Sequence, residues 1–483
     1  MREPCASNRR ACRGRRLGTD QPFVWRGFVH AAAFSPLRAT AEDRSFRSDA
    51  IVLLQFFALA VMVFPSDTVL PAIGAAGYPA SLIGLFVFGV FTVSVLLGFH
   101  DPIRHAHPIQ GVLCVVWVSV LASYIFMDRG RLTGPEIAAA DRVLLRYAVI
   151  TGVALVTAEW LRTLPDVMKV ARILCWAGAF CGFVAVLQFW MSLDLSQYLR
   201  ELPGFVQNHD NPAIQTRGSL NRVQGTAITP IELGVVAGML IPIAVALGIY
   251  DRDRSNFKRW APLTLIVLGV ATSVSRSAIL ALLVAFVVLV VLLPPVLRLA
   301  AFGVLPIALA GIFMSAHGLI GTLASFFTGA SSDPSIQYRT HDYPLAEEVW
   351  QKAPWFGHGP GTWIPADPLN IFDNQYLNSA VEVGLVGLLA LLVFLVVPAL
   401  IALGARRRSA DPQLRLLCGA LAAAGFVAPV CSLTFDSLSF PMFVNVYAIV
   451  LGLTGACWRL AAAEPARIEP QPPVRFWSRR AES

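Results

Sequence analysis

Two arginines lie next to long apolar segments, where a guanidinium group could bind an anion. Arg276 sits in the polar stretch SVSRSA between two apolar runs, and Arg222 lies shortly before another such run. An arginine at the edge of the hydrocarbon costs about 2.5–3.5 kcal/mol on insertion scales, so it is usually functional or partnered. Its planar fork stays charged and matches two phosphate oxygens. Arg276 is therefore our first candidate for a phosphate ligand; an ordinary snorkelling arginine in a turn is the alternative.

Acidic and histidine residues near the same segments could accept a proton. Asp373 and Asn374 directly precede an apolar run, where either could be the helix N-cap. If Asn374 is the cap, Asp373 is left to act as a general base towards a hydroxyl group. His358, in the glycine-rich turn GHGPGT, is the second candidate for a base. Glu232 and Glu382 fall in the first turns of apolar runs, where they either stabilise helix N-termini or line a cavity.

Arg217 and Arg339 lie in two long polar loops, and each alone could equally be a solvated loop residue. Because all these polar groups fall on the same side of the predicted spans, we expect them to contact one substrate. The residues expected to bind substrate without taking part in the chemistry are Arg339, Arg217, Asn374, His358 and Tyr376.

The elements that position these residues are membrane-spanning helices. Of the 483 residues, 56% are hydrophobic and only 14% are charged, whereas soluble domains carry about 25% charged residues. The net charge of +8 resides in short loops between apolar runs, which argues against nucleic-acid binding. The eight cysteines show no CxxC spacing, and most lie in apolar segments, so neither disulfides nor a metal site is predicted.

About twelve spans are predicted, since a span needs about 20 apolar residues. They cover residues 50–64, 81–99, 110–126, 143–158, 172–191, 228–250, 260–275, 277–293, 297–315, 376–402, 414–432 and 440–459. The positive-inside rule then places the arginine-rich loops, such as 251–259 and 406–408, in the cytoplasm. Only the loop at 127–142, with Arg129, Arg131 and Arg142, does not follow this pattern.

This topology leaves two long loops, 192–227 and 316–375, on the outer side, and long loops are usually functional. The second loop contains a predicted amphipathic helix at Tyr343–Lys352. Residues 1–49 lack the apolar core of a signal peptide and are expected to form a disordered cytoplasmic tail, or to precede the true start. Residues 460–483 are expected to form a second cytoplasmic tail, and 50–459 the membrane domain.

The sequence also excludes some chemistry. It contains no GxxxxGK[ST] loop, so ATP hydrolysis is not expected, and it offers no soluble domain for a nucleotide sugar. An activated donor must therefore bring its leaving group within the membrane, and a lipid diphosphate meets that requirement.

Four segments in order resemble the O-antigen ligase and polysaccharide polymerase family (Wzy/WaaL-like membrane glycosyltransferases). They are NRVQGTAITPIELG at 221–234, SVSRSAILALL at 273–283, Arg339 with PWFGHGPGTW at 354–363, and DNQYLNSAVEVGLVGLLALL at 373–392. In the ligase branch a histidine begins the last segment and is thought to activate the acceptor. Here that position is Asp373, which favours a polymerase.

The resemblance implies an all-α, polytopic transmembrane bundle of about 12 spans with a large periplasmic loop, similar to GT-C enzymes. It implies a metal-independent enzyme without a cofactor, in the bacterial inner membrane with its active site facing the periplasm. Its substrate would be an undecaprenyl-diphosphate-linked glycan, its catalytic residues Asp373, Arg276 and Arg222, and its role O-antigen or exopolysaccharide polymerisation. Membrane lipids, a chain-length regulator and a flippase are the expected partners. An O-antigen ligase for lipopolysaccharide and a lipid-glycan flippase or transporter are the alternatives.

Overall fold

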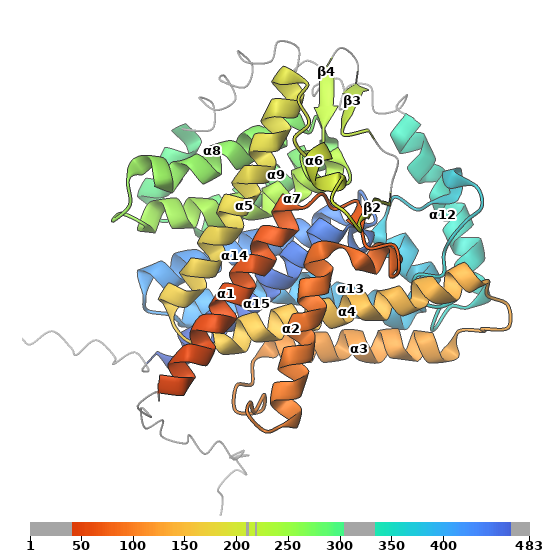
Figure 1. Ribbon diagram of the computed structural model, residues 1–483, viewed down its shortest axis with the longest axis horizontal. Coiled ribbons are helices and arrows are strands. Elements are labelled where there is room, and N and C mark those ends of the chain that lie inside the picture. Colours follow the sequence, from red (N-terminus) through yellow and green to blue (C-terminus); the bar gives the residue numbers. More distant parts are fainter. Residues whose placement is uncertain (1–40, 209–211, 218–219, 304–333, 465–483) are drawn as a thin grey trace, which may run out of the picture. The chain divides into compact units, whose positions relative to one another are not determined.

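The computed structural model describes residues 41–208, 212–217, 220–303 and 334–464. The chain divides into two units, Met1–Arg44 and Ser45–Ser483. Of the first unit the structure describes only Ala41–Arg44, which are helical. The second unit is built mainly from long apolar helices (Figure 1).

The long helices correspond closely to the predicted spans. They are α1 (Ala41–Val63), α2 (Pro79–Leu96), α3 (Pro108–Phe126), α4 (Gly134–Trp160), α5 (Leu164–Met191), α7 (Pro230–Tyr250), α8 (Asn256–Thr272), α9 (Arg276–Leu292), α13 (Gln375–Arg408), α14 (Pro412–Cys431) and α15 (Pro441–Ala463). Several begin with proline, which suits a first helical turn because its missing N–H would have no helical partner there.

Eight of the described helices are long and apolar enough to cross a membrane. The expected spans at 50–64 and 277–293 appear as shorter apolar helices, and 260–275 corresponds to α8. The expected span at 297–315 lies largely outside the described residues. The structure therefore confirms a multi-pass helical protein, while the count of twelve remains a prediction. Helix α1 begins at Ala41, within the segment predicted to be a disordered tail.

Helix ends that are far apart in the sequence meet on one side of the bundle, which we call the site face. Ser66, after α1, donates its backbone N–H to the carbonyl of Thr226, before α7, over 2.8 Å. The Glu232 carboxylate, in the first turn of α7, accepts the N–H groups of Met442 and Phe443 at the start of α15, over 2.8 and 3.1 Å. This carboxylate therefore stabilises the N-terminus of a second helix, as one of the two sequence readings predicted.

Arginines tie the opposite ends of the helices together, on what we call the basic face. Arg172 of α5 forms two hydrogen bonds with Asp251 after α7, over 2.5 and 2.6 Å. Arg406 of α13 donates to the carbonyl of Leu292 at the end of α9 over 2.6 Å. A cation near a helix C-terminus is favourable because carbonyl groups carry partial negative charge there.

Short strands modify the all-α expectation on the site face. β1 (Thr68–Val69) pairs antiparallel with β2 (Val206–Gln207), and β3 (Ile214–Arg217) with β4 (Leu220–Val223). The short helix α6 (Gln197–Arg200) carries Arg200, which binds Asp67 and Asp194 over 3.0 and 2.9 Å with only 11% of its side chain exposed. The first long loop is therefore held in place by a nearly buried ion triad.

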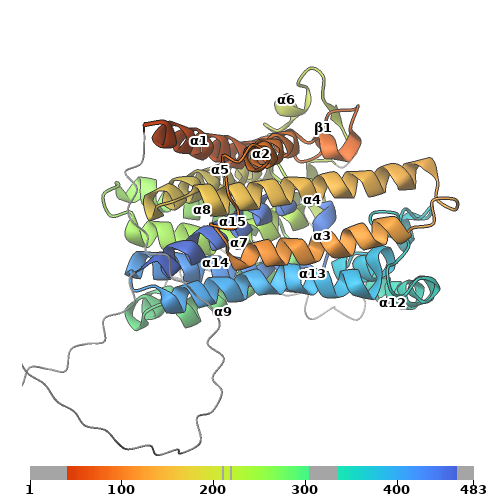
Figure 2. The ribbon, with the colours of Figure 1, turned by 90° about the horizontal axis from the view of Figure 1, so that it is seen from below.

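The second long loop contains α12 (Pro334–Lys352), longer than the predicted helix at Tyr343–Lys352. Figure 2 shows α3 and α13 side by side, with α12 beside the N-terminal end of α13. The short 3₁₀ helices η3 (Pro368–Asn370) and η4 (Ser437–Ser439) lie in the segments before α13 and α15, and η1 (Gly74–Gly77) lies before α2.

Candidate active site

Helix α13 is broken near its start, and the glycine-rich loop fills the break. Gly384 has φ +67° and ψ −166°, so the helical hydrogen bonds cannot continue through it. The carbonyls of Val381 and Glu382 instead accept the N–H groups of His358 and Gly359, over 3.1 and 2.9 Å. Backbone freed within a membrane helix must be satisfied by protein groups, and the loop supplies them.

On the other side of the break, the direction is reversed: α13 donates backbone hydrogen bonds and the loop accepts them. The N–H groups of Leu385 and Val386 donate to the carbonyls of Pro354 and Trp355, over 2.9 and 3.2 Å. A Cβ atom on Gly357, whose φ is +69°, would lie 2.2 Å from the carbonyl oxygen of Glu382. Only glycine permits so close an approach. The two segments that resembled the family, 354–363 and 373–392, are therefore two halves of one interlocked structure.

The start of α13 is fixed by a cap and by the loop between α14 and α15. The Asn374 side chain accepts the N–H of Tyr376 over 2.9 Å and is the N-cap, which leaves the exposed Asp373 outside that role. The buried Gln375 binds the loop twice: its N–H donates to the Ser432 carbonyl over 3.0 Å, and its side-chain oxygen accepts from Leu438 N–H over 2.6 Å.

Helix α9, which begins at Arg276, contacts the end of α14. The residue after Arg276, Ser277, accepts a hydrogen bond from the thiol of Cys431 over 3.9 Å. Cys431 directly precedes Ser432, the partner of Gln375. Helix α9 approaches α7 closely here because a Cβ on Gly234 would lie 2.3 Å from that of Ala278. Arg276 is thus one residue before Ser277, and Asp373 is two residues before Gln375. Both Ser277 and Gln375 are bound to the end of α14.

The other predicted arginines lie in the two long loops. Arg222 is on β4, where it pairs with Gln215 of β3, and β4 packs against α5 and α8. Helix α8 ends at Thr272, just before Arg276. Arg217 pairs with Leu220 at the other end of the same ladder. Arg339 belongs to α12, and its side chain lies outside the described parts of the structure, as does that of Arg217.

Asp436, which the sequence analysis did not single out, lies next to this group. Its carboxylate accepts hydrogen bonds from Ser439 and Asn378 and feels the charges of Arg146 and Asp373. Burial, with the negative charge of Asp373, raises the pKa of Asp436 above its ordinary value despite these hydrogen bonds and Arg146. Two carboxyl groups therefore lie near each other: the exposed Asp373 before α13 and the half-buried Asp436 between α14 and α15.

A signal for Asp436 was present in the sequence. It is the only charged residue in SLTFDSLSF, the connection at 432–440 between the last two spans. Arg146 had a weaker signal, since it follows the one loop that does not obey the positive-inside rule. Neither signal reveals that the charge of Arg146 acts on Asp436; this follows from the packing of α4 against α15.

Several other candidates make structural bonds. The Tyr376 hydroxyl donates to the Pro429 carbonyl over 2.7 Å, and the His358 ring binds the Val349 carbonyl over 3.0 Å through Nε2. Trp363 donates its indole N–H to the Asn370 carbonyl over 3.1 Å and stacks on Phe372. These contacts hold α12, the glycine-rich loop and α13 together, so they shape the site whether or not the same side chains touch substrate.

Within the described ranges no cluster of three or more His, Cys, Asp or Glu residues could hold a metal ion. The expectation that the protein acts without a metal or cofactor stays a prediction.

The helices and this site describe a multi-pass α-helical membrane protein with a polar centre at one end of its bundle. The O-antigen ligase family model matches residues 260–392, which confirms the resemblance to the O-antigen ligase and polymerase family. The matched range contains Arg276, Asp373 and both interlocked segments. No curated protein of known function matches the chain.

Proposed function

We propose that this protein transfers a glycan from an undecaprenyl-diphosphate-linked donor to a sugar hydroxyl at the site face. The observation that supports this best is that the starts of α9 and α13, next to Arg276 and Asp373, lie within the family match and both bind the end of α14. A phosphate ligand and a carboxylate base on neighbouring helix ends are what such a transfer requires.

In the proposed reaction, the donor's lipid lies in the bilayer and its diphosphate against Arg276 and Arg222, with Arg217 and Arg339 as further ligands. Asp373 removes the proton from an acceptor hydroxyl, whose oxygen attacks the anomeric carbon of the donor sugar. The bond from that carbon to the phosphate oxygen breaks, and the lipid diphosphate leaves. The arginines stabilise the charge that develops on the leaving group, often the largest contribution to catalysis.

Asp436 has a supporting role in this proposal. As a neighbouring carboxyl group it makes Asp373 a stronger base when both are ionised, because like charges favour proton uptake. Asp436 could equally take up the proton itself, and the two arrangements predict different pH dependences of the transfer rate.

We further propose that the product is a polymer, as in O-antigen or exopolysaccharide synthesis. The support is Asp373 itself, at the position where ligases of this family have histidine. An O-antigen ligase that attaches finished polymer to lipid A-core is the alternative within the family. A flippase or transporter would bind the same lipid but leave its glycan unchanged. We place the protein in the inner membrane, with the site face in the periplasm.

A deletion strain tests the choice between these functions. Surface polysaccharide and carrier-linked glycan would be separated by size. Single repeat units that accumulate on the carrier, with no long chains, would support a polymerase. Long chains stranded on the carrier would support a ligase. Purified protein that leaves the lengths of lipid-linked glycans unchanged would contradict both.

A further inference from the structure

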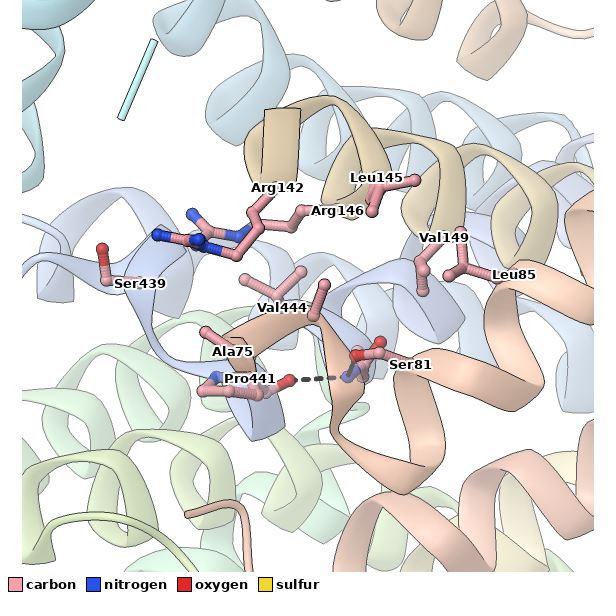
Figure 3. A pocket seen from close by; sticks show the side chains of 12 residues that line it. Ala75, Ser81, Leu85, Arg142, Leu145, Arg146, Val149, Ser439, Pro441 and Val444 are labelled. Atoms are coloured by element: carbon pink, nitrogen blue, oxygen red, sulfur yellow. Dashed lines mark hydrogen bonds between the residues drawn. The ribbon is translucent and has the colours of Figure 1, made fainter. Parts of the chain in front are cut away.

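A second pair of arginines lines a cavity that the proposed donor site does not use, and one of them, Arg146, acts on Asp436 through its charge. Arg142 and Arg146 are half-buried and one turn apart on α4. They line a cavity of about 50 Å³ together with Ser439 and Asn445. Figure 3 shows the two guanidinium groups close to each other, both directed towards the segment that carries Ser439.

Among the residues that the structure describes, the two positive charges have no close counter-ion. Neither guanidinium forms a hydrogen bond or an ion pair with another residue in the described ranges. Arg146 feels the charge of Asp436 at longer range. Like charges one helical turn apart repel each other. A bound anion would offset this repulsion, and the two planar guanidinium groups can donate hydrogen bonds to several phosphate oxygens.

The cavity walls indicate what kind of anion fits. The arginine end is polar, while Leu85 of α2, Val149 of α4 and Val444 of α15 line the remainder. These three residues belong to helices long and apolar enough to span the membrane. The volume is several times the roughly 10–15 Å³ that a cavity needs to hold one water molecule, so a group of several heavy atoms such as a phosphate fits. A phosphate attached to a lipid matches this cavity, because the phosphate would contact the arginines and the lipid would contact the apolar side chains.

The position of the cavity relates it to the proposed reaction. Ser439 lines the cavity and also donates to Asp436, the carboxylate beside Asp373. The cavity therefore lies next to the acidic pair on the side of α4, whereas Arg276 begins α9, which binds the end of α14. An anion at Arg142 and Arg146 would therefore be bound from a different helix than a donor diphosphate at Arg276.

We infer that Arg142 and Arg146 bind a phosphate group of the acceptor's lipid diphosphate, in a site separate from the donor site at Arg276. This rests on the proposed function. An enzyme that joins two carrier-linked chains must hold two lipid diphosphates at once, and the chain has an arginine group for each. The alternative is that Arg146 merely balances the charges of Asp436 and Glu382, both of which it affects. A change at Arg142 distinguishes the two explanations, because Arg142 lines the same cavity and would share the bound phosphate with Arg146.

The test measures binding by the full-length protein in nanodiscs, so it does not depend on activity. The probe is farnesyl diphosphate, with inorganic phosphate as the comparison, in titrations of the wild type and of Arg142→Gln, Arg146→Gln and Arg276→Gln. Arg131→Gln is the matched control, since it removes the same charge from the exposed loop before α4. Thermal unfolding checks that each variant is folded, and Arg142→Lys provides a milder change.

We expect two binding events in the wild type. Arg142→Gln should weaken one of them about 10–100-fold, as expected for a lost charged hydrogen bond, and Arg276→Gln should weaken the other. Arg131→Gln should change neither. A single event that only Arg276→Gln affects would overturn the inference but leave the proposed function intact. Equal binding of inorganic phosphate and farnesyl diphosphate at the Arg142 site would overturn the assignment to a lipid diphosphate. Two events in a protein without transferase activity would support the site and contradict the proposed function.

Discussion

The N–H of Gly359 donates to the carbonyl of Glu382 over 2.9 Å, across a break in a membrane helix. The family-like segments are therefore joined through their backbones, and the chemical groups are arranged around that joint. The loop needs glycine because its backbone lies too close to α13 for a side chain.

Gly357→Ala should disconnect the glycine-rich loop from α13. The new Cβ would lie 2.2 Å from the Glu382 carbonyl oxygen, and the residue has a positive φ. We expect a loss of about 1–3 kcal/mol from strained backbone and a large loss of transferase activity, since the start of α13 would shift. Thermal unfolding and the transfer assay measure the two effects. Gly89→Ala is the control, because a Cβ there meets nothing within 4 Å; equal behaviour of the two variants would contradict the prediction.

Arg276→Lys should retain the protein level but lower the transfer rate. Lysine keeps the charge but loses the planar fork that binds two phosphate oxygens. We expect a reduction of about 10-fold or more, from the loss of at least one charged hydrogen bond, measured as polymer length and yield and as the rate with purified protein. Arg298→Lys is the control. Arg298 follows the opposite end of α9 and binds helix-end carbonyls on the basic face. Full activity in Arg276→Lys would exclude bidentate binding of the diphosphate there.

Asp373→Asn and Asp436→Asn should affect the pH profile differently. If Asp373 is the base, Asp373→Asn removes most activity. Asp436→Asn then removes a neighbouring negative charge, which makes Asp373 easier to ionise and moves the acid limb of the pH–rate profile to lower pH.

If Asp436 is the base, its raised pKa predicts an acid limb above the ordinary range of aspartate, and Asp436→Asn removes activity instead. Activity unchanged in both variants would show that neither carboxylate takes the proton. Asp367→Asn, in the exposed segment before η3, is a suitable control.

Arg200→Gln should loosen the first long loop. It would leave Asp67 and Asp194 nearly buried without their counter-ion, and breaking such a pair costs about 3 kcal/mol. Although burial alone would raise it, hydrogen bonds from Ser196 and Gln188 and the charge of Arg200 lower the pKa of Asp194. A lowered carboxyl pKa stabilises the fold above the unfolded-state pKa, and this stability is lost as the pH falls through the folded-state value.

Unfolding of the wild type should therefore become easier in acid, and Arg200→Gln should reduce that dependence. The measurement is thermal unfolding between neutral pH and pH 3. Arg104→Gln, whose side chain is 84% exposed, is the control. A pH dependence that is the same in wild type and variant would contradict the role of the triad.

Glu232→Ala should destabilise the site face more than any surface change. Its buried carboxylate accepts from Ser66, Ile228, Met442 and Phe443. Because a buried group left without its partner costs about 1–3 kcal/mol, we expect a loss of about 3 kcal/mol or more. Glu232→Gln keeps one acceptor oxygen and should lose less. Similar unfolding temperatures for the two variants would contradict this account.

Sequence alone determined which segments are helical and roughly where they end, because apolar length and proline at helix starts are local properties. It also identified Asn374 or Asp373 as a cap, and the four segments of the family resemblance. Tertiary structure decided the rest. The break at Gly384 depends on a loop some thirty residues earlier, and the effect of the Arg146 charge on Asp436 depends on how α4 packs against α15. Such contacts join residues far apart in the chain, and no local pattern encodes which distant partner will fill a gap or approach a charge.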